Sequence, residues 1–160
     1  MSELNRLPRE QAQDRLFTCF ASRKWAAHVA DGRPYSNLEA LLDAAEQAWA
    51  KLEPSDWKEA LAGHPRIGER GGSSPVASER EQGGVRTAAP TTLDELAAEN
   101  RRYEDRFGRV FLIAAAGKSA VEILTALRRR MDNDPVTESR VAASEHRKIA
   151  RLRLEALARE

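Results

Sequence analysis

Apolar residues recur at intervals of three and four along most of the chain. This spacing is typical of amphipathic helices that bury one face. Each predicted helix begins beside a residue type that favours a helix start. These residues are Pro8, Ser22, Asn37, Pro54, Thr92, Ser119 and Pro135. The last predicted helix runs from Pro135 to about residue 158.

Two stretches depart from the helical pattern. The apolar run Val110–Ile113 stands between Gly108, a natural helix C-cap, and a turn at Gly117. The run is too short for a helix, and we expect buried extended chain there. Six of the nine glycines fall between Gly63 and Gly84, which predicts a long loop with a flexible part at 71–74. Long loops inside compact domains are often functional.

The composition favours an all-α fold. Alanine occurs 27 times, whereas valine and isoleucine together occur 11 times. Helix formers are therefore abundant and β-branched residues are scarce. For 160 residues that are 41% hydrophobic and 32% charged, we expect one globular domain over 1–160. The prediction is a single-domain helical bundle of about seven or eight helices with a Gly/Pro-rich active-site loop.

Charge and hydropathy exclude several classes of protein. With 26 basic and 25 acidic residues, the net charge is +1, so we expect no general attraction to nucleic acid or membranes. No apolar run approaches the ~20 residues of a membrane span, and residues 1–10 lack the apolar core of a signal peptide. We therefore expect a soluble, cytoplasmic protein. The single cysteine, Cys19, rules out an internal disulfide and an all-cysteine metal site, and we expect it in the core.

A first candidate for chemistry is His64, in the sequence Gly63-His-Pro-Arg-Ile-Gly68. Pro65 restricts the backbone around this histidine, so the loop can aim the imidazole into a cavity. An ordinary histidine pKa near ~6.5 suits proton transfer at neutral pH. The alternative is a surface histidine that simply ends a helix.

Two further candidates carry polar groups suited to binding. Ser78, Glu81 and Gln82 could face a cavity and bind amide-like or urea-like groups, or Ser78 and Glu81 could form a helix-capping box. Arg153 lies at the edge of the apolar stripe of the last helix. It could reach inward and hold a carboxylate through two parallel hydrogen bonds, or it could extend along the surface.

Other residues are weaker candidates. His28 and His146 lie on predicted helices without partners at metal-ligand spacing, and no HExxH, paired CxxC or EF-hand sequence occurs. We therefore expect no metal site. The basic run Arg128–Arg130 is interpreted as a solvated helix face.

These segments together resemble the 2-oxo-4-hydroxy-4-carboxy-5-ureidoimidazoline (OHCU) decarboxylase family of urate degradation. The resemblance extends over nearly the whole chain. Its segments are Phe20–Trp25, Arg33–Tyr35, Asp56–Ala60, Gly63–Gly68, Ser78–Gln82, Asn100–Phe111, Gly117–Ser119, Arg128–Glu138 and Lys148–Leu154. Each motif alone is weak, but their order and spacing together are specific.

The resemblance implies an all-α homodimer that decarboxylates OHCU to (S)-allantoin without a metal or organic cofactor. It implies catalytic roles for His64, Glu81 and Arg153. The substrate-contacting positions that it implies are Pro65, Ser78, Gln82, Phe111, Leu112, Ile113, Ala114 and Ala115. The chain departs from the family pattern at Arg109 and Val110, where an aromatic residue and a proline are frequent, and at Ser144–His146, where a Glu-Gln pair is frequent.

Three alternatives stay open at this point. The chain could be a helical interaction module without activity, which would leave OHCU unchanged. It could bind nucleic acid through Arg128–Arg130, although the net charge argues against this. It could also be a decarboxylase of a related ureido or hydantoin-like acid, which the departures at Arg109 and Val110 leave possible.

Overall fold

The computed structural model describes residues 1–69, 72 and 75–160, and these residues form helices joined by turns and extended chain. The predicted flexible stretch at 71–74 falls mostly outside the described residues. Within them there is no strand, which confirms the all-α prediction. The helices are α1 (Ser2–Arg6), α2 (Arg9–Cys19), α3 (Arg23–Asp31), α4 (Leu38–Trp49), α5 (Pro54–Ala62), α6 (Pro75–Glu81), α7 (Gly83–Arg86), α8 (Pro90–Phe107), α9 (Ala120–Arg130) and α10 (Pro135–Arg159).

The chain folds as two compact units, and in the sequence the second unit lies between the two parts of the first. The first unit comprises residues Met1–Gly63 and Ile149–Glu160, and the second comprises His64–Lys148. The long helix α10 therefore begins in the second unit and ends in the first. The chain passes from one unit to the other twice, once directly after α5 and once within α10. The composition does not change at either place.

The first unit is built around a cluster of aromatic side chains. Helix α2 packs on α3, and α3 packs on α4. Trp25 and Trp49 stack with ring centroids 5.5 Å apart, and the Phe20 ring lies 5.3 Å from that of Trp25. The Trp25 indole N–H donates to the Ala45 carbonyl at 3.2 Å, so its polar group is satisfied inside the core. Cys19 is buried beside this cluster, as predicted.

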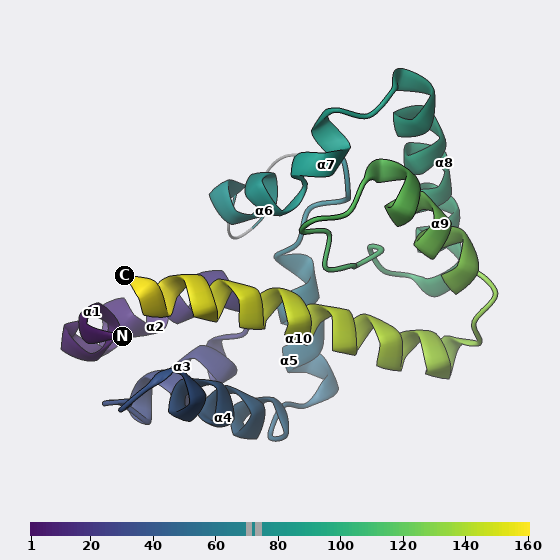
Figure 1. Ribbon diagram of the computed structural model, residues 1–160. Coiled ribbons are helices and arrows are strands. Elements are labelled where there is room, and N and C mark those ends of the chain that lie inside the picture. The colour runs from purple at the N-terminus through teal and green to yellow at the C-terminus, as the bar shows by residue number, and fades with distance from the viewer. Residues whose placement is uncertain (70–71, 73–74) are drawn as a thin grey trace. The chain divides into compact units, whose positions relative to one another are not determined.

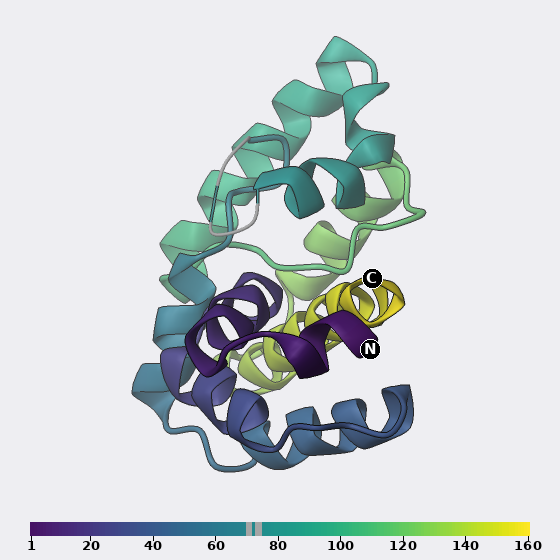
Figure 2. The same ribbon diagram turned by 90° about the vertical axis from the view of Figure 1, so that its left-hand side faces the viewer.

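The second unit is built around α8 and α9, which pack against each other (Figure 1). Between them the chain runs without helix from residue 108 to 119, as Figure 2 shows. Phe111 from this stretch is fully buried, and its ring lies 5.1 Å from that of Tyr103 on α8. The predicted buried extended segment is thus confirmed. It forms part of the second core together with Ile123 and Leu127 of α9.

Several predicted helix boundaries are confirmed by their caps. The side chain of Ser22 accepts a hydrogen bond from the Trp25 N–H, and that of Asn37 accepts one from Ala40 N–H. Ser119 and Glu122 form the predicted capping box, with distances of 3.2 and 2.7 Å. Gly108 ends α8 in the left-handed conformation at φ 67°, which glycine adopts without the cost of a side chain.

Other boundaries were predicted wrongly. Helix α8 begins at Pro90 rather than at a Thr92 cap, because the proline occupies the first helical turn. Ser78 lies inside α6, so it does not cap a helix as the alternative interpretation proposed. Helices α6 and α7 both fall in the stretch expected to be loop, and α1 was not predicted. In the described part of the chain, no helix is both long enough and apolar enough to span a membrane.

Candidate active site

His64 follows the C-terminal end of α5 and contacts a second histidine. Its Nε2 atom lies 2.8 Å from Nε2 of His146 on α10. The two rings meet edge to face, with centroids 4.6 Å apart and planes at 79°. His64 is half-buried, whereas His146 is 1% exposed. The loop therefore holds this imidazole against His146 of α10 within the second unit, which contradicts the alternative of a purely surface histidine.

The predicted substrate-contacting segment Phe111–Ala115 is held at two backbone positions. Arg130 Nη1 donates to the Leu112 carbonyl at 2.7 Å. The Ala114 N–H donates to Glu145 Oε2 at 2.8 Å. Non-helical backbone leaves polar groups that need partners when buried, and these two side chains provide them. The segment is therefore fixed in position without belonging to a helix.

Arg130 belongs to a buried polar network. Its guanidinium contacts Glu138 Oε1 at 2.5 and 2.9 Å, and the Tyr103 hydroxyl donates to the same oxygen at 2.5 Å. Asn133 Nδ2 donates to the other carboxylate oxygen at 2.9 Å. Burial opposes ionisation of Glu138, but the hydrogen bonds from Arg130, Tyr103 and Asn133 outweigh it and lower its pKa. Burial, followed by the hydrogen bond to Glu138, raises the pKa of Tyr103 to about 12.

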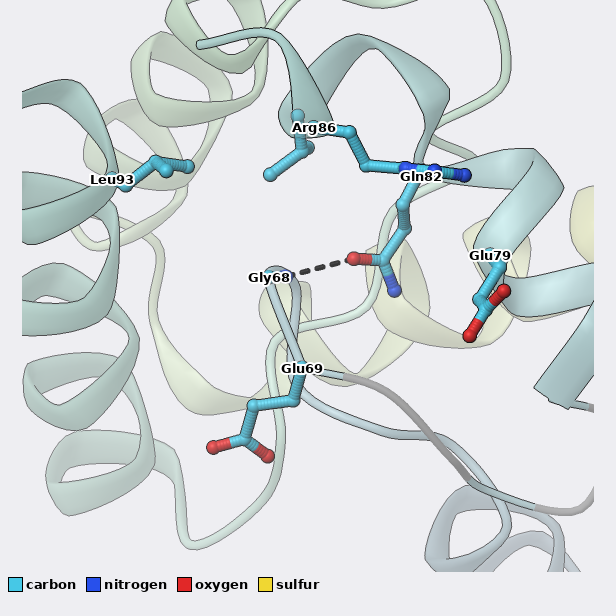
Figure 3. A pocket seen from close by; sticks show the side chains of 7 residues that line it. Gly68, Glu69, Glu79, Gln82, Arg86 and Leu93 are labelled. Atoms are coloured by element: carbon cyan, nitrogen blue, oxygen red, sulfur yellow. Dashed lines mark hydrogen bonds between the residues drawn. The ribbon is translucent and has the colours of Figure 1, made fainter. Parts of the chain in front are cut away.

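Gln82 connects the end of α6 to the loop that follows His64. Its side-chain oxygen accepts a hydrogen bond from the Gly68 N–H at 2.7 Å. A pocket of about 120 Å³ lies beside this contact, and Figure 3 shows Gln82 and Leu93 on opposite sides of Gly68. Glu79 and Arg86 also line the pocket. Ser78 is buried and Glu81 half-buried on the same short helix.

Gly84 brings α7 close to the loop that precedes α9. A Cβ atom at this position would lie 2.1 Å from the Lys118 carbonyl oxygen, much closer than atoms can approach. Glycine is therefore required by the close approach of the two backbones. The same contact holds α7, and with it Gln82, near the end of the non-helical stretch.

The second unit thus links three of the predicted site segments. Gln82 is bonded to the loop that follows His64, and α7 meets the loop after Phe111–Ala115. One turn of α10 contacts both His64, through His146, and the Phe111–Ala115 segment, through Glu145. Pro65 is half-buried next to His64.

Arg153, the remaining predicted catalytic residue, belongs to the first unit. It is 8% exposed, and its Nη1 donates to the Thr18 carbonyl at 3.2 Å. The guanidinium therefore points into the protein, and the alternative of a side chain extended along the surface is wrong.

The sequence analysis missed the contact of His146 and interpreted Arg130 wrongly. His146 was set aside because it has no partner at metal-ligand spacing, yet it contacts His64 from 82 positions away. Arg130 was assigned to a solvated face, but it is 7% exposed and paired with Glu138. The helical periodicity could have indicated that His146 is buried, because it falls in register with the buried residues Ala142, Ile149 and Ala150 of α10.

The departures from the family pattern occupy different environments. Arg109 is half-buried, and its Nη1 donates to the Ser139 hydroxyl of α10 at 3.1 Å. Val110 is half-buried directly before the buried segment. Among the described residues, no group of three or more His, Cys, Asp or Glu side chains is arranged to hold a metal ion.

Comparison with known proteins places these features in context. The family model of OHCU decarboxylase matches residues 5–155. The 2-oxo-4-hydroxy-4-carboxy-5-ureidoimidazoline decarboxylase of Haloferax volcanii is 31% identical over 163 residues, covering 96% of this chain and 93% of that protein. A crystal structure of OHCU decarboxylase in the presence of (S)-allantoin superposes with a TM-score of 0.80 at 30% identity, over 92% of this chain and 99% of that chain.

Some relatives are longer than this chain, and only part of their length matches it. The uric acid degradation bifunctional protein TTL of Arabidopsis thaliana is 33% identical over 151 residues, which is 91% of this chain and 47% of that protein. The bifunctional protein of a Bacillus species is 26% identical, and the match covers 32% of its length. This chain thus spans about half or a third of the bifunctional relatives and almost all of the archaeal one.

Proposed function

Because the chain belongs to the OHCU decarboxylase family, we propose that it removes CO2 from OHCU and forms (S)-allantoin in urate degradation. The observation that carries this proposal is the convergence of His64 and the Phe111–Ala115 segment on one turn of α10. This convergence falls on residues whose roles the family resemblance implies.

The chemistry of the substrate explains which groups are needed. The carboxylate is on a ring carbon that also bears a hydroxyl, next to an unsaturated ring position. When the bond to the carboxylate breaks, CO2 leaves, the electron pair moves into the ring, and the unsaturated ring position takes up a proton from solvent, which gives an enol. The hydroxyl then loses its proton to become a carbonyl, and the neighbouring ring carbon gains a proton. The protein must orient the ring, stabilise negative charge and deliver that proton to one face.

Each predicted residue suits one of these tasks. His64 accepts the hydroxyl proton and takes part in reprotonation, as an imidazole near neutral pH can. Glu81 and Gln82 bind the ureido nitrogens. Arg153 binds an anionic or carbonyl oxygen through its planar fork. Pro65, Ser78 and the Phe111–Ala115 segment shape the surrounding wall. We further propose that the reaction needs no metal or organic cofactor, because the substrate's own ring delocalises the electron pair.

The assignment of His64 is tested by replacing it with alanine. We expect His64→Ala to lower the rate of OHCU consumption by roughly 10²–10⁴-fold, the usual contribution of a positioned acid or base. The matched control is His28→Ala, since His28 is an exposed histidine on α3. The rate is followed by the ultraviolet absorbance of OHCU made in situ from urate. A His64→Ala protein with the wild-type rate would refute the role of His64.

The remaining expectations extend the same proposal. We propose that the chain acts as a homodimer in the cytoplasm on a small ureidoimidazoline, without nucleic-acid or membrane partners. Light scattering on the purified protein measures the mass, and a mass of one chain would contradict the dimer. If the protein left OHCU unchanged but decarboxylated a related hydantoin-like acid, the alternative substrate class that Arg109 and Val110 leave open would replace this one.

A further inference from the structure

The contact between His64 and His146 requires a particular arrangement of hydrogens. Their Nε2 atoms are 2.8 Å apart. An imidazole nitrogen either carries a hydrogen or presents a lone pair, so a contact of this length joins one N–H donor to one bare nitrogen. One hydrogen is therefore shared between the two rings. In a neutral pair, the ring that accepts this hydrogen bond carries its own hydrogen at Nδ1.

We propose that His146 is a positioning residue for His64, which fixes its tautomer and ring orientation and accepts a hydrogen bond from it while His64 carries the substrate proton. This inference rests on the proposed function, in which His64 takes the proton of the substrate hydroxyl. In that step the substrate O–H bond breaks and an N–H bond forms on His64. The resulting imidazolium donates through Nε2 to the bare Nε2 of His146, which stabilises the cation. The proton later leaves His64 when the ring carbon is protonated.

The surroundings of His146 suit a positioning role. Its side chain is 1% exposed and belongs to the long helix α10, so packing restricts its rotamers. The preceding residue, Glu145, accepts the Ala114 N–H at 2.8 Å and the Lys148 ammonium at 2.6 Å. The same helical turn therefore fixes both the partner of His64 and the segment expected to contact the substrate. We expect a change at His146 to alter how His64 is held relative to that segment.

Kinetics of two variants test the proposal. His146→Phe keeps a flat ring of similar size but cannot accept a hydrogen bond, and we expect kcat to fall roughly 10- to 100-fold, as when a supporting hydrogen-bond partner is removed. We expect KM to change less than about threefold, because His146 is buried and in this proposal acts only through His64. His146→Gln keeps a hydrogen-bonding group and should recover most of the lost kcat. A wild-type kcat for His146→Phe would overturn the proposal.

A double variant tests whether His146 acts through His64 or independently of it. If His146 acts through His64, then His146→Phe adds no further loss to His64→Ala. An additional tenfold loss in the double variant would overturn the inference while leaving the role of His64 intact. A fully active His64→Ala protein would overturn the proposed role of His64 and this inference together. An inactive His64→Ala with a fully active His146→Phe would overturn the inference alone.

NMR offers a readout that does not depend on turnover, and its main part needs only the wild-type protein. Long-range ¹H–¹⁵N NMR spectra distinguish hydrogen-bearing from bare imidazole nitrogens. At a pH where both rings are neutral, we expect one Nε2 of the pair to carry the hydrogen and the other to be bare. We also expect the ring signals of His146 to shift in His64→Ala. Two bare or two hydrogen-bearing Nε2 atoms would contradict the shared proton.

Discussion

At the scale of single residues, a buried charged pair of the second unit holds the backbone of its non-helical segment. Arg130 pairs with Glu138 and donates to the Leu112 carbonyl. Removing one partner of a buried pair leaves the other charge without compensation. The free energy that this costs exceeds the net stabilisation that the intact pair provides. The stability of the unit and the position of its non-helical segment therefore depend on the same carboxylate.

The substitution Glu138→Gln measures this dependence. We expect it to lower the free energy of unfolding by about 3 kcal/mol, because Arg130 keeps its charge and loses the carboxylate. The matched control is Glu95→Gln, which removes the exposed partner of Arg128 and should cost less than about 1 kcal/mol. Urea denaturation followed by circular dichroism compares the two. Equal losses in both variants would contradict the account.

The lowered pKa of Glu138 also predicts a pH dependence. A carboxyl group whose pKa is lower in the folded state stabilises the fold above its unfolded pKa, roughly 4.3, and loses that contribution as the pH falls through its folded pKa. We therefore expect wild-type stability to decrease as the pH is lowered below about 4.3. The decrease should be smaller in Glu138→Gln. If the stability of the two proteins decreased equally in acid, a group other than Glu138 would be responsible for the decrease.

Replacing Arg153 with lysine tests whether the planar shape of its guanidinium matters, because the charge is kept. We expect Arg153→Lys to lower kcat/KM for OHCU at least roughly tenfold, because lysine keeps the charge but not the planar fork. Arg151→Lys, an exposed position on the same helix, serves as the control and should retain the wild-type value. A fully active Arg153→Lys protein would exclude bidentate binding of the substrate.

At the scale of elements, Gly84 sets the distance between α7 and the loop before α9. We expect Gly84→Ala to lower stability by about 1–3 kcal/mol and to weaken OHCU turnover, because the new methyl group meets the Lys118 carbonyl and displaces backbone. Gly83→Ala is the matched control in the same helix, since its Cβ meets nothing within 4 Å. Thermal melting and the OHCU assay measure both effects, and equal behaviour of the two variants would contradict the close approach.

Much of the element structure could be predicted because its determinants are local. Ser22, Asn37 and Ser119 bond to backbone within three residues, and Gly108 needs only its own φ angle. Helices α6 and α7 were missed because they are short and lie among glycines, where periodicity carries little information. Their positions are supported by nonlocal contacts such as Gln82 to Gly68 and Gly84 to Lys118.

At the scale of the whole molecule, the sequence identified the family but not how its residues are supported. The motif order predicted His64 and the Phe111–Ala115 segment. It did not predict that His146 and Glu145 contact them, because such pairs are brought together only by the fold. The division into two units was also not predictable from composition, since the chain passes between them at Gly63 and within α10.

The central claim is that this chain converts OHCU into one enantiomer of allantoin. Decarboxylation leaves a planar carbon that water protonates equally from both faces, so the uncatalysed product is racemic. With OHCU generated in situ from urate, we expect the protein, before and after treatment with a chelator, to produce the circular dichroism signal of (S)-allantoin. An optically inactive product formed at the rate of the protein-free reaction would contradict the account.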